Sequence, residues 1–249
     1  MWPSIIKNII FSSKYRYKIY LNAFKGYRPL RPPDAPWHNA VLKNAEELRR
    51  AAKQASILSL PVHPKTWDDL AMLDYILKNI DKKGAILDAG SSIKSQILVS
   101  LFLYGYDNLT GISLEFKEKI RKGTIKYERG DITGTRFADG TFDAVICQSV
   151  IEHGVDLQKF FAEASRILKR SGVLIVTTDY YKEPVDTTGK TAFGLPWKIF
   201  SEKDMRNILA MAAHYGFEPT GPLDLECEDR PVRWLGLSYT FLICTLRKE

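Results

Sequence analysis

Short apolar runs alternate along most of the chain with longer stretches whose apolar positions recur every three to four residues. The short runs predict buried strands at 86–89, 109–112, 125–128, 142–147 and 173–178. The longer stretches predict helices at 95–104, 116–121, 157–169 and 201–215. Strands that alternate with helices are typical of a parallel sheet with helices on both faces. We therefore expect an α/β protein with a doubly wound sheet, which ends in strands near 217–223 and 239–246.

The first third of the chain has a different pattern. A proline-rich stretch at 31–36 separates a basic, aromatic segment from two further predicted helices at 39–58 and 66–80. We predict three parts: a basic aromatic arm (1–33), a helical extension (34–83) and the main α/β domain (84–249).

The charge is concentrated in the arm. The chain has a net charge of +7, and residues 1–33 contain seven Lys and Arg residues but no Asp or Glu. The rest of the chain is therefore neutral overall, and we expect no nucleic-acid-binding surface on it.

Two interpretations of the arm stay open. Its isoleucines at positions 5, 6, 9 and 10 share one helical face beside the bases. This favours either an anchor on a membrane surface or an arm that packs on its own domain or on a second subunit. No apolar run approaches the ~18 residues of a transmembrane helix. Three cysteines without a CxxC pair are typical of reduced thiols. We expect a cytoplasmic protein, with membrane contact through the arm as the open alternative and the oligomeric state undetermined.

The turn after the first predicted strand of the main domain is the first candidate for chemistry. Residues 86–96 read ILDAGSSIKSQ, an apolar run that ends in Asp88, Gly90 and small residues before a helical pattern. A strand, tight turn and helix of this kind bring a nucleotide cofactor close to the backbone. Glycine suits the turn because it has no Cβ and accepts a positive φ.

Three more motifs follow in order: GDI at 130–132, FDAV at 142–145 and RILKRSG at 166–172. With ILDAG at 86–90, they make the chain resemble the class I S-adenosylmethionine-dependent methyltransferases over about residues 84–248. The resemblance implies a Rossmann-like sheet of seven mostly parallel strands, the last of them antiparallel at 239–246. It also implies S-adenosyl-L-methionine as the cofactor.

The resemblance assigns cofactor contacts to residues at the ends of the strands. Asp88 would organise the loop and the methionine amino group, and Gly90 would let the backbone approach the cofactor. Asp131 would bind the adenine amino group, Ile132 would line the adenine, and Gln148 with Ser149 would lie beside the methionine portion. The alternatives are that Asp88 and Asp131 only cap or tie loops and that Ile132 packs in the core.

Two positions depart from the family pattern. The family's ribose-binding acid after the second strand is replaced by Ser113, with Glu115 two residues on. Either Glu115 reaches the ribose through a shifted turn, or Ser113 binds it. Ser92 and Lys94 stand where the family has loop glycines. We assign Ser92 to the cofactor loop, and Lys94 either meets the cofactor carboxylate or faces solvent.

Two residues are candidate catalysts. His153, in SVIEH at 149–153, has a side chain that can accept a proton near neutral pH, and Asp179 follows the fifth predicted strand. A structural histidine that orders the loop is the alternative, because methyl transfer needs mostly positioning and no base is obligatory. An acidic cluster at positions 224, 226, 228 and 229 suits Mg²⁺ or a solvated loop. We expect the loop and predict no metal site.

Residues 180–197 combine aromatics with Asp and Thr, which suits stacking on a polar ring or, alternatively, core packing. We predict a methyltransferase that acts at oxygen on a small or glycan-like acceptor, with a loose resemblance to enzymes of glycan and polysaccharide biosynthesis. The alternatives are a lipid or quinone methyltransferase at the membrane surface and a catalytically inactive, methyltransferase-like interaction module. A nicotinamide dehydrogenase fits the glycine pattern poorly.

Overall fold

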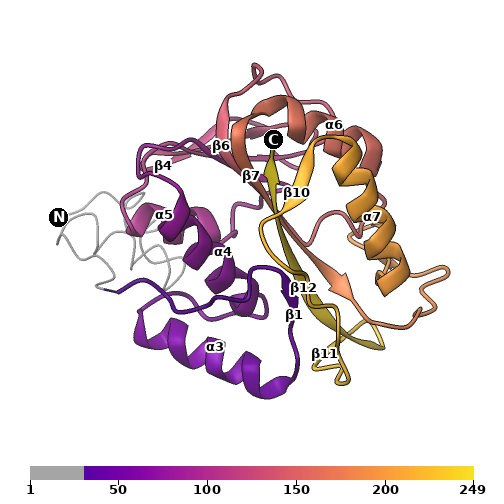
Figure 1. Cartoon of the computed structure of the whole chain (residues 1–249). Coiled ribbons are helices and arrows are strands. Elements are labelled where there is room, and N and C mark those ends of the chain that lie inside the picture. The colour runs from indigo at the N-terminus through magenta and orange to yellow at the C-terminus, as the bar shows by residue number, and fades with distance from the viewer. Residues whose placement is uncertain (1–30) are drawn as a thin grey trace.

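The computed structural model describes residues 31–249, which form helices around a central mixed sheet (Figure 1). The predictions for the first 30 residues of the arm lie outside this range. Five parallel strands run in the spatial order β7-β6-β2-β3-β5, and a long strand, β12, pairs antiparallel with β7. Their bounds are β2 (Ile86–Ala89), β3 (Leu109–Ser113), β5 (Ile125–Arg129), β6 (Phe142–Gln148), β7 (Leu168–Tyr180) and β12 (Leu237–Lys248). The predicted doubly wound α/β fold is confirmed.

Short strands complete both edges of the sheet. The free edge of β12 pairs in turn with β11 (Val232–Trp234), β1 (Ala40–Val41) and β10 (Phe217–Pro219), while β4 (Ile120–Lys122) pairs with β5. Over residues 31–249 the sheet thus has ten strands rather than the predicted seven. A separate ribbon consists of β8 (Thr191–Ala192) and β9 (Leu195–Pro196).

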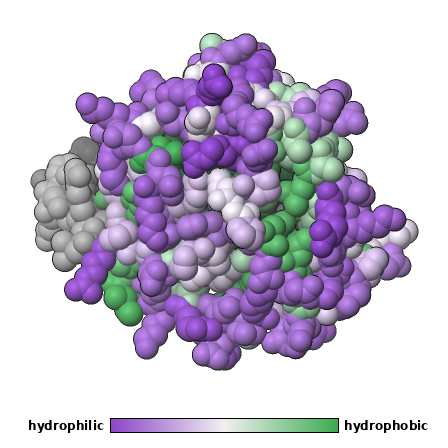
Figure 2. Space-filling view, viewed as in Figure 1, coloured by the Kyte–Doolittle hydropathy of each residue, from purple (hydrophilic) through white to green (hydrophobic). Residues whose placement is uncertain are grey.

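The helices lie in two groups. Figure 1 shows α3 (Ala45–Ile57), α4 (Thr66–Asn79) and α5 (Ile97–Leu103) on one side of the sheet, and α6 (Leu157–Ile167) and α7 (Glu202–His214) on the other. On the face drawn in Figure 2, hydrophilic side chains cover most of the surface, with hydrophobic strips between them.

One predicted helix was wrong, and another was predicted to begin too early. The predicted helix at 116–121 is absent, and β4 forms there by pairing Ile120–Lys122 with β5. The helix predicted from residue 39 begins at Ala45, because the Asn44 side chain caps it by accepting hydrogen bonds from two backbone amides of its first turn. The preceding residues pair with β12 instead.

Helix α4 is the element that most affects the site. Its residues from Thr66 to Ile76 are all buried, including three acids, Asp68, Asp69 and Asp74. It packs against α3, α5, β6 and β12, so residues 34–83 share one core with the strands that follow. The N-terminal end of α4 therefore lies at the carboxyl ends of β6 and β7, where side chains of all three elements meet.

Candidate active site

The order of the strands reverses between β2 and β6. From β2 the chain proceeds to β3 and β5 on one side, and from β6 to β7 and β12 on the other. In open α/β sheets, ligands bind at the carboxyl ends of the strands beside such a reversal. The sequence-predicted residues at the ends of β2, β3, β5 and β6 therefore belong to one edge of the sheet.

The turn after β2 is held by Asp88. Its buried carboxylate accepts a hydrogen bond from Ser95 Oγ at 2.8 Å, and burial raises its pKa to about 6, against the opposing effect of Ser91 and Ser95. The Ser92 hydroxyl accepts a hydrogen bond from the Lys94 amide, so Ser92 also shapes this turn. The hydrogen bond from Ser95 to Asp88 stabilises this loop, which is the structural role that was one of the two interpretations of Asp88.

Gly90 is required by a close contact within the chain. It has φ +89°, and a Cβ at this position would lie 2.4 Å from Cγ2 of Val150. A residue with a side chain does not fit here unless Val150 moves, because the Cβ would lie much closer to Val150 than van der Waals contact allows. The residue that approaches the Gly90 backbone in this structure is Val150, which follows the end of β6.

A groove runs beside the ends of β3 and β5. It encloses a cavity of about 570 Å³, whose lining includes Ile112, Leu114, Gly130 and Asp131. Leu114 is 58% exposed, so it offers an apolar surface in the groove. Asp131 Oδ1 accepts hydrogen bonds from the amide and hydroxyl of Thr133, at 2.8 and 2.7 Å, which ties the loop.

Three other predicted residues near this groove do not line its cavity. Ile132 is half-buried against the core. Ser113 Oγ accepts a hydrogen bond from the Glu115 amide at 3.2 Å, so both residues belong to the turn after β3. Ser113 is half-buried and Glu115 is exposed.

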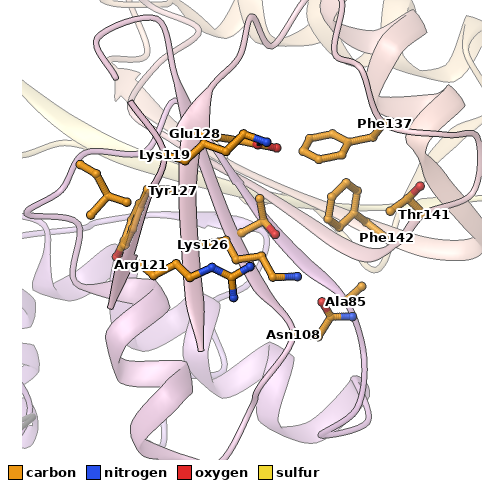
Figure 3. Close-up of a pocket in the computed structure, with 12 residues that line it drawn as sticks. Ala85, Asn108, Lys119, Arg121, Lys126, Tyr127, Glu128, Phe137, Thr141 and Phe142 are labelled. Atoms are coloured by element: carbon orange, nitrogen blue, oxygen red, sulfur yellow. Dashed lines mark ion pairs between the residues drawn. The ribbon is translucent and has the colours of Figure 1, made fainter. Parts of the chain in front are cut away.

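A smaller cavity of about 310 Å³ adjoins the groove, and Lys119, Glu128 and Phe137 line both. Figure 3 shows its lining from β4, β5 and the start of β6. Ala85 and Asn108 lie at its far end, just before β2 and β3 begin. This cavity therefore extends toward the amino ends of the strands, away from the Asp88 turn.

The end of β6 contacts α4. Gln148 Nε2 donates to Asp69 Oδ1 at 2.8 Å, and Asp69 Oδ2 lies 2.6 Å from His63 Nε2. Ser149 has φ +52°, an uncommon conformation for a residue other than glycine, and such strain clusters at functional sites. Its buried hydroxyl makes no hydrogen bond with the described residues.

Asp179, a predicted catalyst, is held between two donors. Lys65 Nζ lies 3.2 Å from its Oδ1, and Trp197 Nε1 donates to its Oδ2 at 2.9 Å. Lys65 also lies over the Phe241 ring, 3.4 Å from the centroid. The contacts with Lys65 and Trp197 therefore hold both oxygens of Asp179 in place.

Two more acids are buried beside this pair. Burial raises the pKa of Asp68 to about 7, although Lys65, 3.8 Å away, lowers it. Burial and the neighbouring charge of Asp179 also raise the pKa of Glu152. Both oxygens of Asp68 and Oε1 of Glu152 lack a hydrogen bond of normal geometry within residues 31–249, although Thr177 is close enough to Asp68 to lower its pKa. Buried carboxylates with raised pKa values are typical of sites that bind or catalyse.

His153 lies at the outer side of the same cluster. Burial lowers its pKa, so the ring is neutral at pH 7 and can accept a proton. Its Nδ1 is buried and has no partner within the described part of the chain. Its ring makes an edge contact with Phe193, with 5.7 Å between centroids.

The aromatic residues of 180–197 mostly pack in the core. Tyr180, Tyr181 and Trp197 are buried, whereas Phe193 is 81% exposed. The stacking role predicted for this segment can therefore apply only to Phe193 among these four. In the acidic cluster near the C-terminus, Asp224 and Glu226 form ion pairs with Lys43 and Lys182. No group of three or more possible metal-binding side chains occurs within 31–249.

The contribution of α4 to the candidate site was not predicted from the sequence. His63, Lys65, Asp68 and Asp69 come from the start of this helix or just before it, and none was assigned a role. The available signal was the run TWDDLAMLDYI at 66–76, where acids interrupt an otherwise apolar helix. Charged residues are rarely buried without a partner or a function.

Comparison with known proteins agrees with this architecture. A family model described as a methyltransferase domain matches residues 87–176. A sterol 24-C-methyltransferase from Eremothecium gossypii is 31% identical over 120 residues, which cover 44% of this chain and 31% of that protein. The chain thus spans about a third of the length of this curated relative.

Solved structures share the fold at low sequence identity. The geranyl diphosphate C-methyltransferase of Streptomyces coelicolor A3(2), solved with Mg²⁺, geranyl diphosphate and S-adenosyl-L-homocysteine, has a TM-score of 0.55 and 17% identity. The likeness covers 96% of this chain and 99% of that one. The [4+2]-cyclase SpnF has a TM-score of 0.57 and 16% identity, over 98% and 94% of the two chains.

The fold is that of the Rossmann-like, S-adenosyl-L-methionine-dependent methyltransferases. The match to a methyltransferase domain model over residues 87–176 supports the predicted class of enzyme. The SpnF structure indicates that the fold also carries a cyclase, so the reaction of this chain must be argued from its own site.

Proposed function

We propose that this protein transfers a methyl group from S-adenosyl-L-methionine to an oxygen of a small acceptor, bound where α4 meets the ends of β6 and β7. The observation that carries the proposal is the cluster of buried polar atoms there. Asp68, Ser149 and Glu152 each bury oxygen atoms that lack a hydrogen-bond partner among residues 31–249. Each such atom costs about 1–3 kcal/mol, so a cluster is expected where a polar ligand supplies the missing partners.

The residues present fit the cofactor at both ends. The groove offers Leu114 as an apolar surface and the Asp131 carboxylate as an acceptor for the adenine amino group. Asp88, Gly90 and Ser92 would form the loop beside the methionine portion, with Gln148 at the end of β6 and Ser149 just after it on the other side. Ser113 and Glu115, in one turn after β3, are the candidates for the ribose hydroxyls.

The chain's own residues would then orient the acceptor and remove its proton. The bound cofactor supplies an electrophilic methyl group, and the reaction needs in-line positioning above all. His153 accepts the acceptor's hydroxyl proton at its unpartnered Nδ1. Asp179 holds Lys65 beside the cluster, where its charge balances the buried acids.

The cofactor site is tested by calorimetric titration with S-adenosylhomocysteine. We expect wild-type protein to bind, and Asp131→Ala to weaken binding at least about tenfold, or about 1.4 kcal/mol. Thr133→Val removes one loop hydrogen bond but keeps the carboxylate, and Asp107→Ala removes an exposed acid elsewhere. Both controls should bind like wild type.

Equal weakening by Thr133→Val and Asp131→Ala would show that Asp131 acts only on the loop. No binding to folded wild-type protein would favour the alternative of an inactive interaction module.

A lipid acceptor is the second candidate. The relative from Eremothecium gossypii is a sterol methyltransferase, and the exposed Phe193 ring is an apolar surface beside His153. Incubation with methyl-labelled S-adenosyl-L-methionine and either a lipid extract or a soluble metabolite and glycan extract separates the two candidates. Label that moves into the organic phase favours the lipid, and label on glycan or small polar products favours the first proposal.

The proposal also includes the location of the protein in the cell and the role of the basic arm. The described residues contain no helix long and apolar enough to cross a membrane. A cytoplasmic location, with the basic arm at residues 1–33 in contact with a membrane surface, is compatible with either acceptor. Sedimentation with vesicles before and after deletion of the arm tests this, and equal sedimentation of both proteins would rule out the arm as an anchor.

A further inference from the structure

Two hairpin tips lie side by side at the outer end of the candidate site. One hairpin joins β8 to β9 through Phe193 and Gly194, and the other joins β11 to β12 through Leu235 and Gly236. The Phe193 ring lies 5.8 Å from that of Trp234, the residue before the second tip. The two tips therefore form one surface, which we call the hairpin surface.

Each tip places an apolar residue in a conformation that does not favour it. Phe193 has φ +54° and Leu235 has φ +47°, and the glycine after each also has a positive φ. Asparagine or glycine is the usual choice at the first position of such two-residue turns, and an ordinary side chain costs about 1–2 kcal/mol there. The turn geometry therefore does not explain why apolar residues occupy these positions.

The apolar side chains at the tips are exposed. Phe193 is 81% exposed, Leu195 50% and Leu235 44%. They make up three of the six large hydrophobic side chains exposed within residues 31–249, so exposed apolar area is concentrated here. Concentrated apolar area on a protein surface is typical of a protein or membrane contact.

The charge around the tips distinguishes between these partners. Residues 187–198 and 230–238 contain Lys190, Lys198, Arg230 and Arg233 but no Asp or Glu. Lys198 pairs with Asp204, and Arg230 lies over the Tyr181 ring. A second copy docked face to face would oppose bases to bases, whereas an anionic lipid surface attracts them.

We propose that the hairpin surface docks on an anionic lipid bilayer, with Phe193, Leu195 and Leu235 entering the interface. Apolar tips that enter a bilayer and bases that meet lipid head groups strengthen each other's binding. Because Phe193 contacts the His153 ring, docking places the entrance of the candidate site at the lipid surface. The proposal concerns binding and does not depend on the methyl acceptor.

The test uses the full chain and variants that suit the turns. Asparagine accepts the positive φ at both tips, so the double variant Phe193→Asn, Leu235→Asn should keep the fold while it removes two apolar groups. Ile57→Asn, which removes a 73% exposed side chain from α3, is the matched control. Binding is measured by sedimentation with vesicles of phosphatidylcholine alone and of phosphatidylcholine with phosphatidylserine.

We expect binding to the mixed vesicles only, and a loss of at least about tenfold in the double variant but not in the control. The basic arm could also bind vesicles, so a second readout follows the tip itself. A polarity-sensitive dye on Leu235→Cys should shift its emission to the blue when mixed vesicles are added, and a dye on Ile57→Cys should not.

Three results would overturn the proposal. One is an unchanged dye signal on Leu235→Cys while the protein sediments with vesicles, because binding would then use another surface. Another is a blue shift that grows with protein concentration without lipid, which would identify a second copy as the occupant. The third is a wild-type chain that binds neither kind of vesicle.

Discussion

The buried carboxyl of Asp68 makes a quantitative prediction about stability and pH. Its side chain is fully buried, and Thr177 and Lys65 are the neighbouring groups that favour its charged form. Burial raises its pKa from 3.8 to about 7, with Lys65 acting in the opposite direction. At 1.36 kcal/mol for each pH unit, this difference corresponds to about 4 kcal/mol.

The direction in which stability changes with pH depends on whether the folded or the unfolded chain holds the Asp68 proton more tightly. Below about pH 4 both the folded and the unfolded chain keep Asp68 protonated, so its burial carries no ionisation penalty. Between about pH 4 and pH 7 the unfolded chain releases the proton first, and the folded state loses stability as the pH rises. Above about pH 7 the loss is complete and constant.

Asp68→Asn removes this ionisation while it keeps a side chain of similar size. We expect the variant to gain stability relative to wild type between about pH 4 and pH 7, up to about 4 kcal/mol, and to show a constant difference above that. The measurement is urea unfolding of both proteins across this range, after a check that two probes give coincident transitions.

Asp107→Asn, which replaces an exposed acid, is the control for the substitution itself. A pH-independent difference for Asp68→Asn would refute the reasoning, since it would mean that Asp68 has similar pKa values in the folded and unfolded states. A variant that is less stable at pH 8 would show that the contact with Lys65 outweighs the burial of the acid.

Three further changes test other parts of the structure. Gly90→Ala should destabilise the fold and abolish S-adenosylhomocysteine binding, and adding Val150→Ala should restore only part of the stability because φ +89° stays unfavourable; thermal unfolding and calorimetry measure both effects. Glu163→Gln should lower the free energy of unfolding by about 1–3 kcal/mol at pH 7. Although burial opposes it, hydrogen bonds from Arg166 and neighbouring groups lower the pKa of Glu163, so the deficit should shrink as the pH falls below that pKa in denaturant titrations. Ser201→Ala should cost about 1 kcal/mol, because the Ser201 side chain caps α7 in a capping box; an unchanged urea midpoint would contradict this.

Local patterns predicted the elements that depend on local chemistry. Strands β2, β3, β5 and β6 form where the sequence has short apolar runs. The turn at Asp88 and Gly90 forms where the residue types suit a tight turn. The prediction of a helix at 116–121 was wrong because pairing with β5 determines the structure of this segment. Pairing between strands depends on residues that are distant in sequence, so the pattern within a short stretch does not reveal it.

The same limit explains the missed site residues. Lys65 meets Asp179 across 114 positions of sequence, and Gln148 meets Asp69 across 79. The periodicity of apolar residues does not predict these contacts, because they depend on where α4 packs against the sheet. The predicted catalysts His153 and Asp179 do lie near each other, but the identity of their partners required the folded chain.

The position of β12 has a consequence for how the protein is made. This strand includes residues Leu237–Lys248, it pairs with β1 near the start of the described chain, and its Phe241 ring lies under Lys65. A ribosome synthesises these residues about 200 positions after those of β1. The nascent chain therefore contains residues 87–176, which match the methyltransferase domain model, before β12 can pair with β1 and β7. A protein without β12 would keep residues 87–176 but would lose the strand that pairs with β1 and β7 and the Phe241 ring under Lys65.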